Sequence, residues 1–126
     1  MEITEVEYLE RARAVLAKIL ADVPALKVRW EMPAPVPPPD VAQLIDFGLE
    51  LQLDNRIYRI AGEFKAHGFP QHLSQAIAQL LRYRYKVGRN DDLMVAAPYI
   101  TPEGAKVCLN DNVSYFDLAG NCRIAM

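Results

Sequence analysis

Apolar and polar residues alternate over residues 46–53, a pattern that is typical of a half-buried β-strand. Residues 56–65 predict a second strand, and Asp54 and Asn55 between the two runs tolerate the left-handed backbone angles of a tight turn. The two runs therefore predict an antiparallel hairpin with a two-residue loop. In that hairpin, the last residue of the first strand faces the first residue of the second strand.

The two-residue loop determines which side chains of the hairpin face each other. It sets Glu50 opposite Arg59, a favourable pair of opposite charges, and it sets Asp46 opposite Glu63. Directly opposed residues have Cβ atoms ~5 Å apart, so two carboxylates repel each other unless a cation lies between them. Lys65 is two residues beyond Glu63 and is expected to share its face of the strand.

Two carboxylates and a lysine at the open end of a hairpin predict a small site for a hard cation. Carboxylate oxygens suit Mg²⁺ or Mn²⁺, and a neighbouring lysine steadies a phosphate or an attacking water. Gly48 and Ala61 are small, and they are expected to leave this face open beside the acids. Asp40, which follows Pro39, is an alternative first ligand, although it lies upstream of the opposing register.

The remaining pattern predicts an α/β domain that spans residues 1–126. Its mixed sheet is expected to carry the antiparallel hairpin, with helices on its faces, in the order α-β-β-β-α-β-α-β. One more strand is expected to begin at Cys122. The Pro-rich residues 33–39 predict an extended spacer rather than a ligand for an SH3-type domain. The expected helices are 4–22, 70–86 and 101–110, and the other expected strands are 26–31, 92–97 and 113–118.

The composition is that of an ordinary soluble globular protein, since 52% of the 126 residues are hydrophobic and 24% are charged. No apolar run approaches ~18 residues, so no membrane-spanning helix is expected. The acidic N-terminus differs from the basic start of a signal peptide, and a cytoplasmic setting is expected. Cys108 and Cys122 are expected to be free thiols, and a single cysteine pair argues against a zinc site.

The charge distribution is uneven, although the net charge is only −2. Residues 64–90 contain five basic residues and no acid. Arg82, Lys86 and Arg89 share one helix face if the helix runs that far, whereas Arg84 does not join them. This face is either a solvated helix surface or a surface that binds the phosphate backbone of DNA. Two or three phosphate contacts predict weak binding, unless the chain forms a homodimer.

Asp46, followed by Glu63-Phe64-Lys65, resembles the D…(D/E)-x-K signature of the PD-(D/E)XK nuclease superfamily, which has the restriction-endonuclease-like fold. The resemblance implies that the two acids hold a divalent metal, Mg²⁺ or Mn²⁺, with help from the backbone carbonyl of Phe64. It also implies that Lys65 assists the attack of water on a phosphodiester. Gln79 and Tyr83 resemble the Q-x-x-x-Y element of exonuclease branches, or they are a solvent-facing glutamine and a packed tyrosine.

The last third of the chain carries a second resemblance. A-P-Y-I-T-P-E-G-A, then Y-F-D-L-A-G-N-C-R-I, is similar to a bacterial group with a PD-(D/E)XK-like domain. Members of that group often continue into a winged-helix region, so a truncated form is expected here. Asp117 and Asn121 are expected to cap the D-L-A-G-N turn rather than take part in catalysis.

The sequence leaves two functions open. The first is metal-dependent hydrolysis of DNA by the D…E-x-K residues, with the basic helix holding the phosphate backbone. The second is a non-catalytic DNA- or protein-binding regulatory module that keeps the nuclease fold, acting as a dimer or as part of a defence or toxin–antitoxin locus. The intact D…E-x-K residues favour the first function, whereas the acidic net charge and the small size favour the second.

Overall fold

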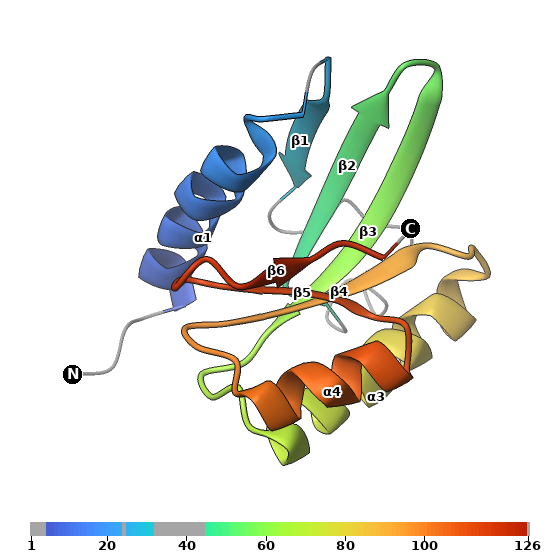
Figure 1. Cartoon of the computed structure of the whole chain (residues 1–126). Helices are drawn as coiled ribbons and strands as arrows, with labels where there is room; N and C mark the ends of the chain where they lie inside the picture. Colours follow the sequence, from blue (N-terminus) through green and yellow to red (C-terminus); the bar gives the residue numbers. More distant parts are fainter. Residues whose placement is uncertain (1–4, 24, 32–44, 126) are drawn as a thin grey trace.

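The computed structural model describes residues 5–23, 25–31 and 45–125. These residues form a six-stranded mixed β-sheet and three helices, and the strands lie in the sheet in their order along the chain (Figure 1). The elements are α1 (Glu5–Leu20), β1 (Lys27–Glu31), β2 (Phe47–Leu53), β3 (Arg56–Phe64), α3 (Pro70–Val87), β4 (Asp92–Ala97), α4 (Pro102–Asn110), β5 (Ser114–Asp117) and β6 (Cys122–Arg123).

The strand directions confirm an α/β fold with a mixed sheet. The pairs β1–β2 and β2–β3 are antiparallel. The pairs β3–β4 and β4–β5 are parallel, and the crossover helices α3 and α4 join their strands. β6 pairs antiparallel with β5 and adds one strand to the expected order. The expected boundaries differ from the observed ones by at most two residues in the described part. The Pro-rich spacer and Asp40 lie outside it.

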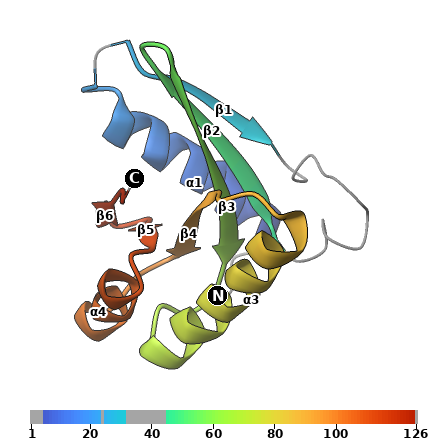
Figure 2. The same ribbon diagram turned by 90° about the vertical axis from the view of Figure 1, so that its right-hand side faces the viewer.

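The helices cover opposite faces of the sheet (Figures 1 and 2). The buried cluster on the α1 side contains Tyr8, Ala12, Leu16, Phe47, Leu49, Leu51, Ile60, Met94, Ala96 and Phe116. The cluster on the side of α3 and α4 contains Ile45, Ala61, Leu73, Ala76, Ile77, Leu80, Tyr83, Leu93, Val95, Ala97, Ile100, Cys108 and Val113. Because β4 contributes to both clusters, it is buried on both faces, as its apolar sequence predicts.

The hairpin has the expected register. Leu53 pairs with Arg56 and Glu50 pairs with Arg59, so the loop has two residues. Asp54 takes a left-handed backbone conformation with φ 55°, as the turn requires. At the other end of the hairpin the ring of Phe47 lies over Gly62, because a β-carbon at residue 62 would overlap that ring. A larger residue at that position would force the buried ring to move.

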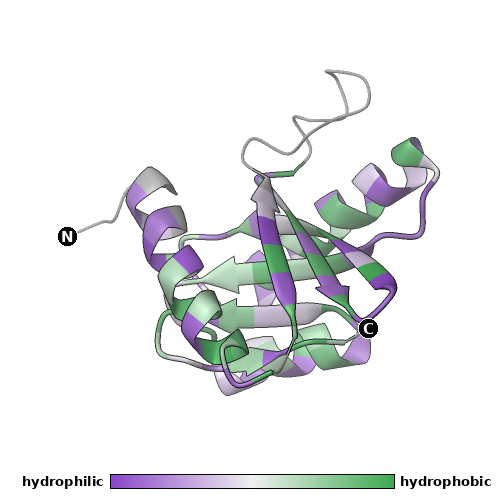
Figure 3. Cartoon of the chain, turned by 90° about the horizontal axis from the view of Figure 1, so that it is seen from above, coloured by the Kyte–Doolittle hydropathy of each residue, from purple (hydrophilic) through white to green (hydrophobic). Residues whose placement is uncertain are grey.

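The alternation of side chains along β3 assigns its residues to the two faces, and apolar and polar residues alternate visibly along the outer strands (Figure 3). Ile60 and Phe64 pack on the α1 side, whereas Ala61 packs on the side of α3. Arg59 and Glu63 therefore belong to the same face as Ala61. This assignment decides which charged residues of the hairpin share a surface.

The ends of the two crossover helices follow local sequence signals. α3 begins at Pro70, which needs no hydrogen-bond acceptor at the first helical position. It ends at Gly88, which takes the left-handed conformation with φ 73°. α4 begins after Thr101, whose Oγ1 accepts a hydrogen bond of 3.0 Å from the backbone N–H of Gly104. Among the described helices, none has the length and apolar character needed to cross a membrane.

Candidate functional site

Asp46 lies directly before β2 and is fixed on β3 by two hydrogen bonds. Its backbone N–H donates to the carbonyl of Gly62 (2.9 Å), and its Oδ2 accepts from the backbone N–H of Phe64 (2.8 Å). The paired residues of the ladder end at Phe47 and Gly62, one step before the expected Asp46–Glu63 pair. Asp46 is therefore hydrogen-bonded to Gly62 and Phe64, the two sequence neighbours of Glu63. Its carboxylate, rather than a backbone carbonyl, accepts the hydrogen bond from the Phe64 N–H.

Glu63 lies near the end of β3 and is only 4% exposed. It pairs in the parallel ladder with Val95 of β4 and faces the side of the sheet that α3 covers. The expectation that small residues leave this face open is wrong, because Ala61 is 2% exposed and packs in the cluster that contains the apolar residues of α3. Gly48, its partner in β2, is also buried. The packing of α3 encloses this side of the acidic pair.

Lys65 directly follows β3, and its side chain is half-buried. Its backbone N–H donates to the carbonyl of Ala96 in β4 (2.9 Å), while the preceding Phe64 is held by Asp46 on the β2 side. The Phe64 ring stacks on Tyr8 of α1, with ring centroids 3.9 Å apart. The Glu-Phe-Lys segment is thus fastened to both neighbouring strands and to a helix.

The described residues contain no group of three or more His, Cys, Asp or Glu side chains that could hold a metal ion. The donors available at this end of β3 are the carboxylates of Asp46 and Glu63 and the backbone carbonyl of Phe64. Mg²⁺ is usually held in proteins by one or two carboxylates together with waters and substrate phosphates. The oxygen donors therefore fit Mg²⁺ or Mn²⁺ in kind.

The two further candidates on α3 have different surroundings. Tyr83 is 3% exposed and belongs to the buried cluster on the α3 side, so the interpretation as a packed tyrosine applies to it. Its hydroxyl accepts a long hydrogen bond from Nη2 of Arg89 (3.5 Å). Gln79 is half-buried on the same helix.

The basic residues of the α3 region do not form one face. Because α3 ends at Val87, Arg89 lies outside the helix, and the condition for a shared face with Arg82 and Lys86 is not met. Arg89 binds Asp91 through Nε (3.3 Å) and Nη2 (3.1 Å), and this hydrogen bonding raises the pKa of the Arg89 guanidinium. Arg82 and Lys86 are exposed on α3. The backbone carbonyl of Asp91 also accepts a hydrogen bond from Nη1 of Arg84 (3.3 Å).

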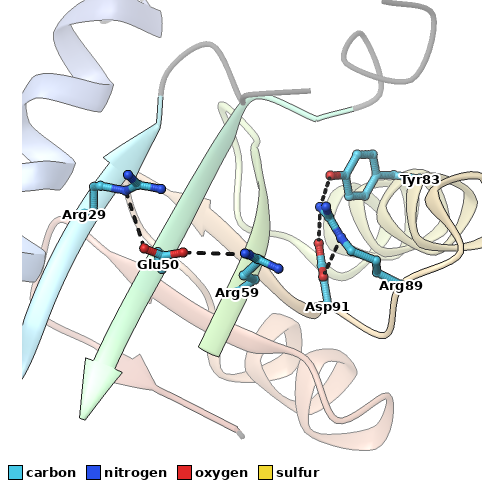
Figure 4. Close-up of polar contacts among 6 residues, drawn as sticks. All are labelled: Arg29, Glu50, Arg59, Tyr83, Arg89 and Asp91. Carbon is cyan, nitrogen blue, oxygen red and sulfur yellow. Dashed lines mark hydrogen bonds and ion pairs between the residues drawn. The ribbon is translucent and has the colours of Figure 1, made fainter. Parts of the chain in front are cut away.

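A row of charged side chains crosses β1, β2 and β3 (Figure 4). Glu50 lies in the middle, with Oε2 3.5 Å from Nε of Arg29 and Oε1 3.7 Å from Nε of Arg59. We call these three residues the arginine row. The hairpin register predicts the Glu50–Arg59 pair, but Arg29 enters through the pairing of β1 with β2, which the sequence pattern leaves unspecified.

Asp117, at the end of β5, is a buried carboxylate that holds the following turn, as expected. Oδ1 accepts hydrogen bonds from the backbone N–H groups of Ala119 (3.0 Å) and Asn121 (2.9 Å). Oδ2 accepts from the backbone N–H of Ile100 (2.9 Å) and from Nδ2 of Asn121 (2.8 Å). Burial and, to a smaller extent, the charge of Asp117 raise the pKa of the Cys122 thiol.

No protein-family model, curated protein or solved structure matches this chain. The chemistry of the site therefore rests on its own residues. Asp46, Glu63 and the carbonyl of Phe64 are oxygen donors of the kind that hold a hard cation, and the half-buried Lys65 follows Phe64 at the end of β3. The arrangement suits the binding and polarisation of a phosphate group.

Proposed function

We propose that this chain is a Mg²⁺-dependent nuclease of the restriction-endonuclease-like type, which hydrolyses phosphodiester bonds of DNA. The proposal is carried by the hydrogen bond between Asp46 and the backbone N–H of Phe64. This bond holds the first acid of the D…E-x-K residues against the Glu-Phe-Lys segment, although it lies 18 positions away in the sequence. The D…E-x-K motif is a weak signal in the sequence alone, and this hydrogen bond adds spatial support for it.

Each residue of the site has a defined task in the proposed reaction. Asp46, Glu63 and the carbonyl of Phe64 hold the cation, which when bound supplies charge neutralisation at the phosphoryl oxygens. Lys65 donates a hydrogen bond that orients the attacking water or steadies the phosphate. The water oxygen attacks phosphorus on the side opposite the leaving oxygen and loses a proton to solvent, while the P–O bond to the leaving oxygen breaks and that oxygen takes up a proton from solvent.

The burial of Glu63 supports a second candidate function. At 4% exposure, the acid has little direct access to solvent, and α3 packs over the neighbouring Ala61. A non-catalytic module that binds DNA or another protein needs no access to the acids. In that module the D…E-x-K residues would serve only to hold the end of the hairpin.

Cleavage assays on purified protein separate the two candidates. Supercoiled plasmid, linear duplex and single-stranded DNA, and RNA, are incubated with Mg²⁺ or Mn²⁺, and binding of Mn²⁺ is measured by calorimetry. We expect Lys65→Ala to lower the cleavage rate by about 10²-fold or more while metal affinity stays nearly unchanged. Asp46→Ala and Glu63→Ala are expected to lose both cleavage and metal binding.

Lys106→Ala provides the matched control, because Lys106 is an exposed lysine on α4 outside the site. It should cleave like the unaltered chain. Cleavage that survives both Lys65→Ala and Asp46→Ala would belong to a contaminant or to another site. DNA binding without cleavage in either metal would favour the non-catalytic module.

A further inference from the structure

We infer that the arginine row is a docking surface for the phosphate backbone of a nucleic acid. The choice of partner rests on the proposed function. The inference assigns phosphate contacts to Arg29 and Arg59 on the sheet, and not chiefly to the basic residues of α3. Both side chains lie on the face that carries Glu63, as the alternation along β3 and the pairing Arg29–Glu50–Arg59 require.

The two arginines are held in position but remain accessible. Their side chains are 66% and 58% exposed, whereas that of Glu50 between them is 21% exposed. Both contacts with Glu50 go through Nε, so the outer nitrogens of the Arg59 guanidinium take no part in that ion pair. A guanidinium fixed through one edge still presents planar donors to a phosphate. Glu50 therefore orients the row without covering it.

On the exposed part of this face of β1–β3, Lys27, Arg29 and Arg59 accompany the half-buried Glu50, whereas Glu63 further along β3 is buried. Lys27 is exposed and lies two residues before Arg29 in β1, so it shares the same face. Its partner in β2 is the neutral Gln52, and Glu50 is the acid within the row. A polyanion is the partner that this charge pattern attracts.

Strand geometry gives the distance between the arginine row and the proposed catalytic residues. Arg59 and Glu63 are four residues apart on β3, which corresponds to roughly 13 Å along the strand. Arg29 and Arg59 are two strands apart, which corresponds to about 10 Å across the sheet. A hollow of about 350 Å³ opens beside Arg59 and is also lined by Arg89, Asn90 and the acids Asp91 and Asp92. A backbone bound at the row reaches the acids only by passing α3, which packs over the intervening Ala61.

Binding in the absence of divalent metal tests the inference without requiring catalysis. Fluorescence anisotropy with a labelled short duplex and a labelled single strand, in EDTA, gives the affinity over a range of salt concentrations. We expect Arg29→Gln and Arg59→Gln each to weaken binding by roughly threefold to tenfold. Each should also reduce the log–log salt slope by about 0.9 on duplex DNA. Arg59→Lys should keep most of the slope, because it keeps the charge.

Two matched controls remove the same charge elsewhere. Arg56→Gln changes an exposed residue of the same strand whose position alternates to the opposite face, and Arg11→Gln changes an exposed residue of α1. Both are expected to bind nearly as tightly as the unaltered chain. Thermal melting of every variant checks that the fold is intact.

The inference is overturned by equal losses in the controls, by unchanged binding of a double variant that carries both Arg29→Gln and Arg59→Gln, or by binding of polyglutamate in preference to the oligonucleotides. A loss confined to replacement of Arg82 and Lys86 would return the phosphate contacts to α3. Cleavage that is indifferent to the row rejects the inference and leaves the proposed function standing. Binding that depends on the row without cleavage in Mg²⁺ or Mn²⁺ rejects the catalytic function and leaves the inference standing.

Discussion

Asp46 and Asp117 both place a carboxylate at the end of a strand, but the two carboxylates are used differently. Asp117 accepts four hydrogen bonds, two on each oxygen, from the turn that follows β5 and from the neighbouring loop. The side chain of Asp46 accepts one described hydrogen bond, from Phe64 on the adjacent strand. An ionised carboxylate has about four lone-pair sites, so Asp117 uses them all within the fold.

The difference shows how a carboxylate that holds a turn can be told from one that retains capacity for a ligand. Asp117 is fully buried, and its donors come from residues close in sequence and from one loop beside it. Asp46 is half-buried and is held beside the backbone of Phe64, the residue that follows Glu63. Two carboxylates brought together at this strand end would repel each other unless a cation binds, and the proposed function supplies that cation.

The largest effect is expected for Asp117→Ala, measured by urea denaturation. The Ile100 N–H is buried, and leaving it without a partner costs about 1–3 kcal/mol, while the three donors from the exposed Ala119 and Asn121 add less, so we expect a loss of about 3 kcal/mol. Asp111→Ala is the control, because Asp111 is exposed at the end of α4. A loss below about 1 kcal/mol at residue 117 would show that the turn holds without its carboxylate.

A smaller effect is expected at Asp46. Asp46→Ala removes one hydrogen bond and should lower the free energy of unfolding by about 1 kcal/mol. Asp46→Asn keeps an acceptor for Phe64 and removes the repulsion with Glu63, so it should raise that free energy by about 0.5 kcal/mol. Mg²⁺ should raise the melting temperature of the unaltered chain and of neither variant. A variant with asparagine that is as unstable as the one with alanine would contradict the like-charge argument.

The smallest effect concerns the Cys122 thiol. Burial is the main cause of its raised pKa, and the charge of Asp117 is the second cause. Asp117→Asn removes that charge, so the pKa of Cys122 should fall and its alkylation at mildly alkaline pH should become faster, by less than about tenfold. The buried Cys108, whose pKa is raised to about 11 chiefly by burial, is the internal reference in the same peptide map. Equal acceleration at both thiols would indicate loosening of the fold.

Much of the fold could be predicted from the sequence, because its signals are local. A two-residue loop at Asp54 leaves one register for the hairpin, and the apolar run of β4 indicates burial on both faces. The end of α3 also had a signal, since Gly88 after a basic last turn is a common helix stop. It agrees with the expected helix 70–86, which already leaves Arg89 outside.

The parts that could not be predicted depend on contacts between distant segments. The exposure of the face beside Ala61 depends on how α3 packs on the sheet, and no local pattern of β3 encodes it. Arg29 joins the arginine row only because β1 pairs with β2 at one particular register. The paired residues of β2 and β3 end at Phe47, one step before Asp46, and the Asp46 side chain accepts the hydrogen bond from the Phe64 N–H. An alternating pattern of apolar and polar residues does not show whether a side chain or a backbone carbonyl accepts a hydrogen bond at the end of a strand.

The sequential order of the strands has a consequence for how the protein is made. Each strand pairs with the strand translated just before it, so the sheet can grow one strand at a time as the chain leaves the ribosome. α1 is the exception, because the cluster on which Leu16 packs also includes Phe116 of β5. The apolar stripe of α1, which is synthesised early, is therefore fully covered only after β5 has been synthesised. During synthesis part of that stripe stays uncovered until β5 is in place.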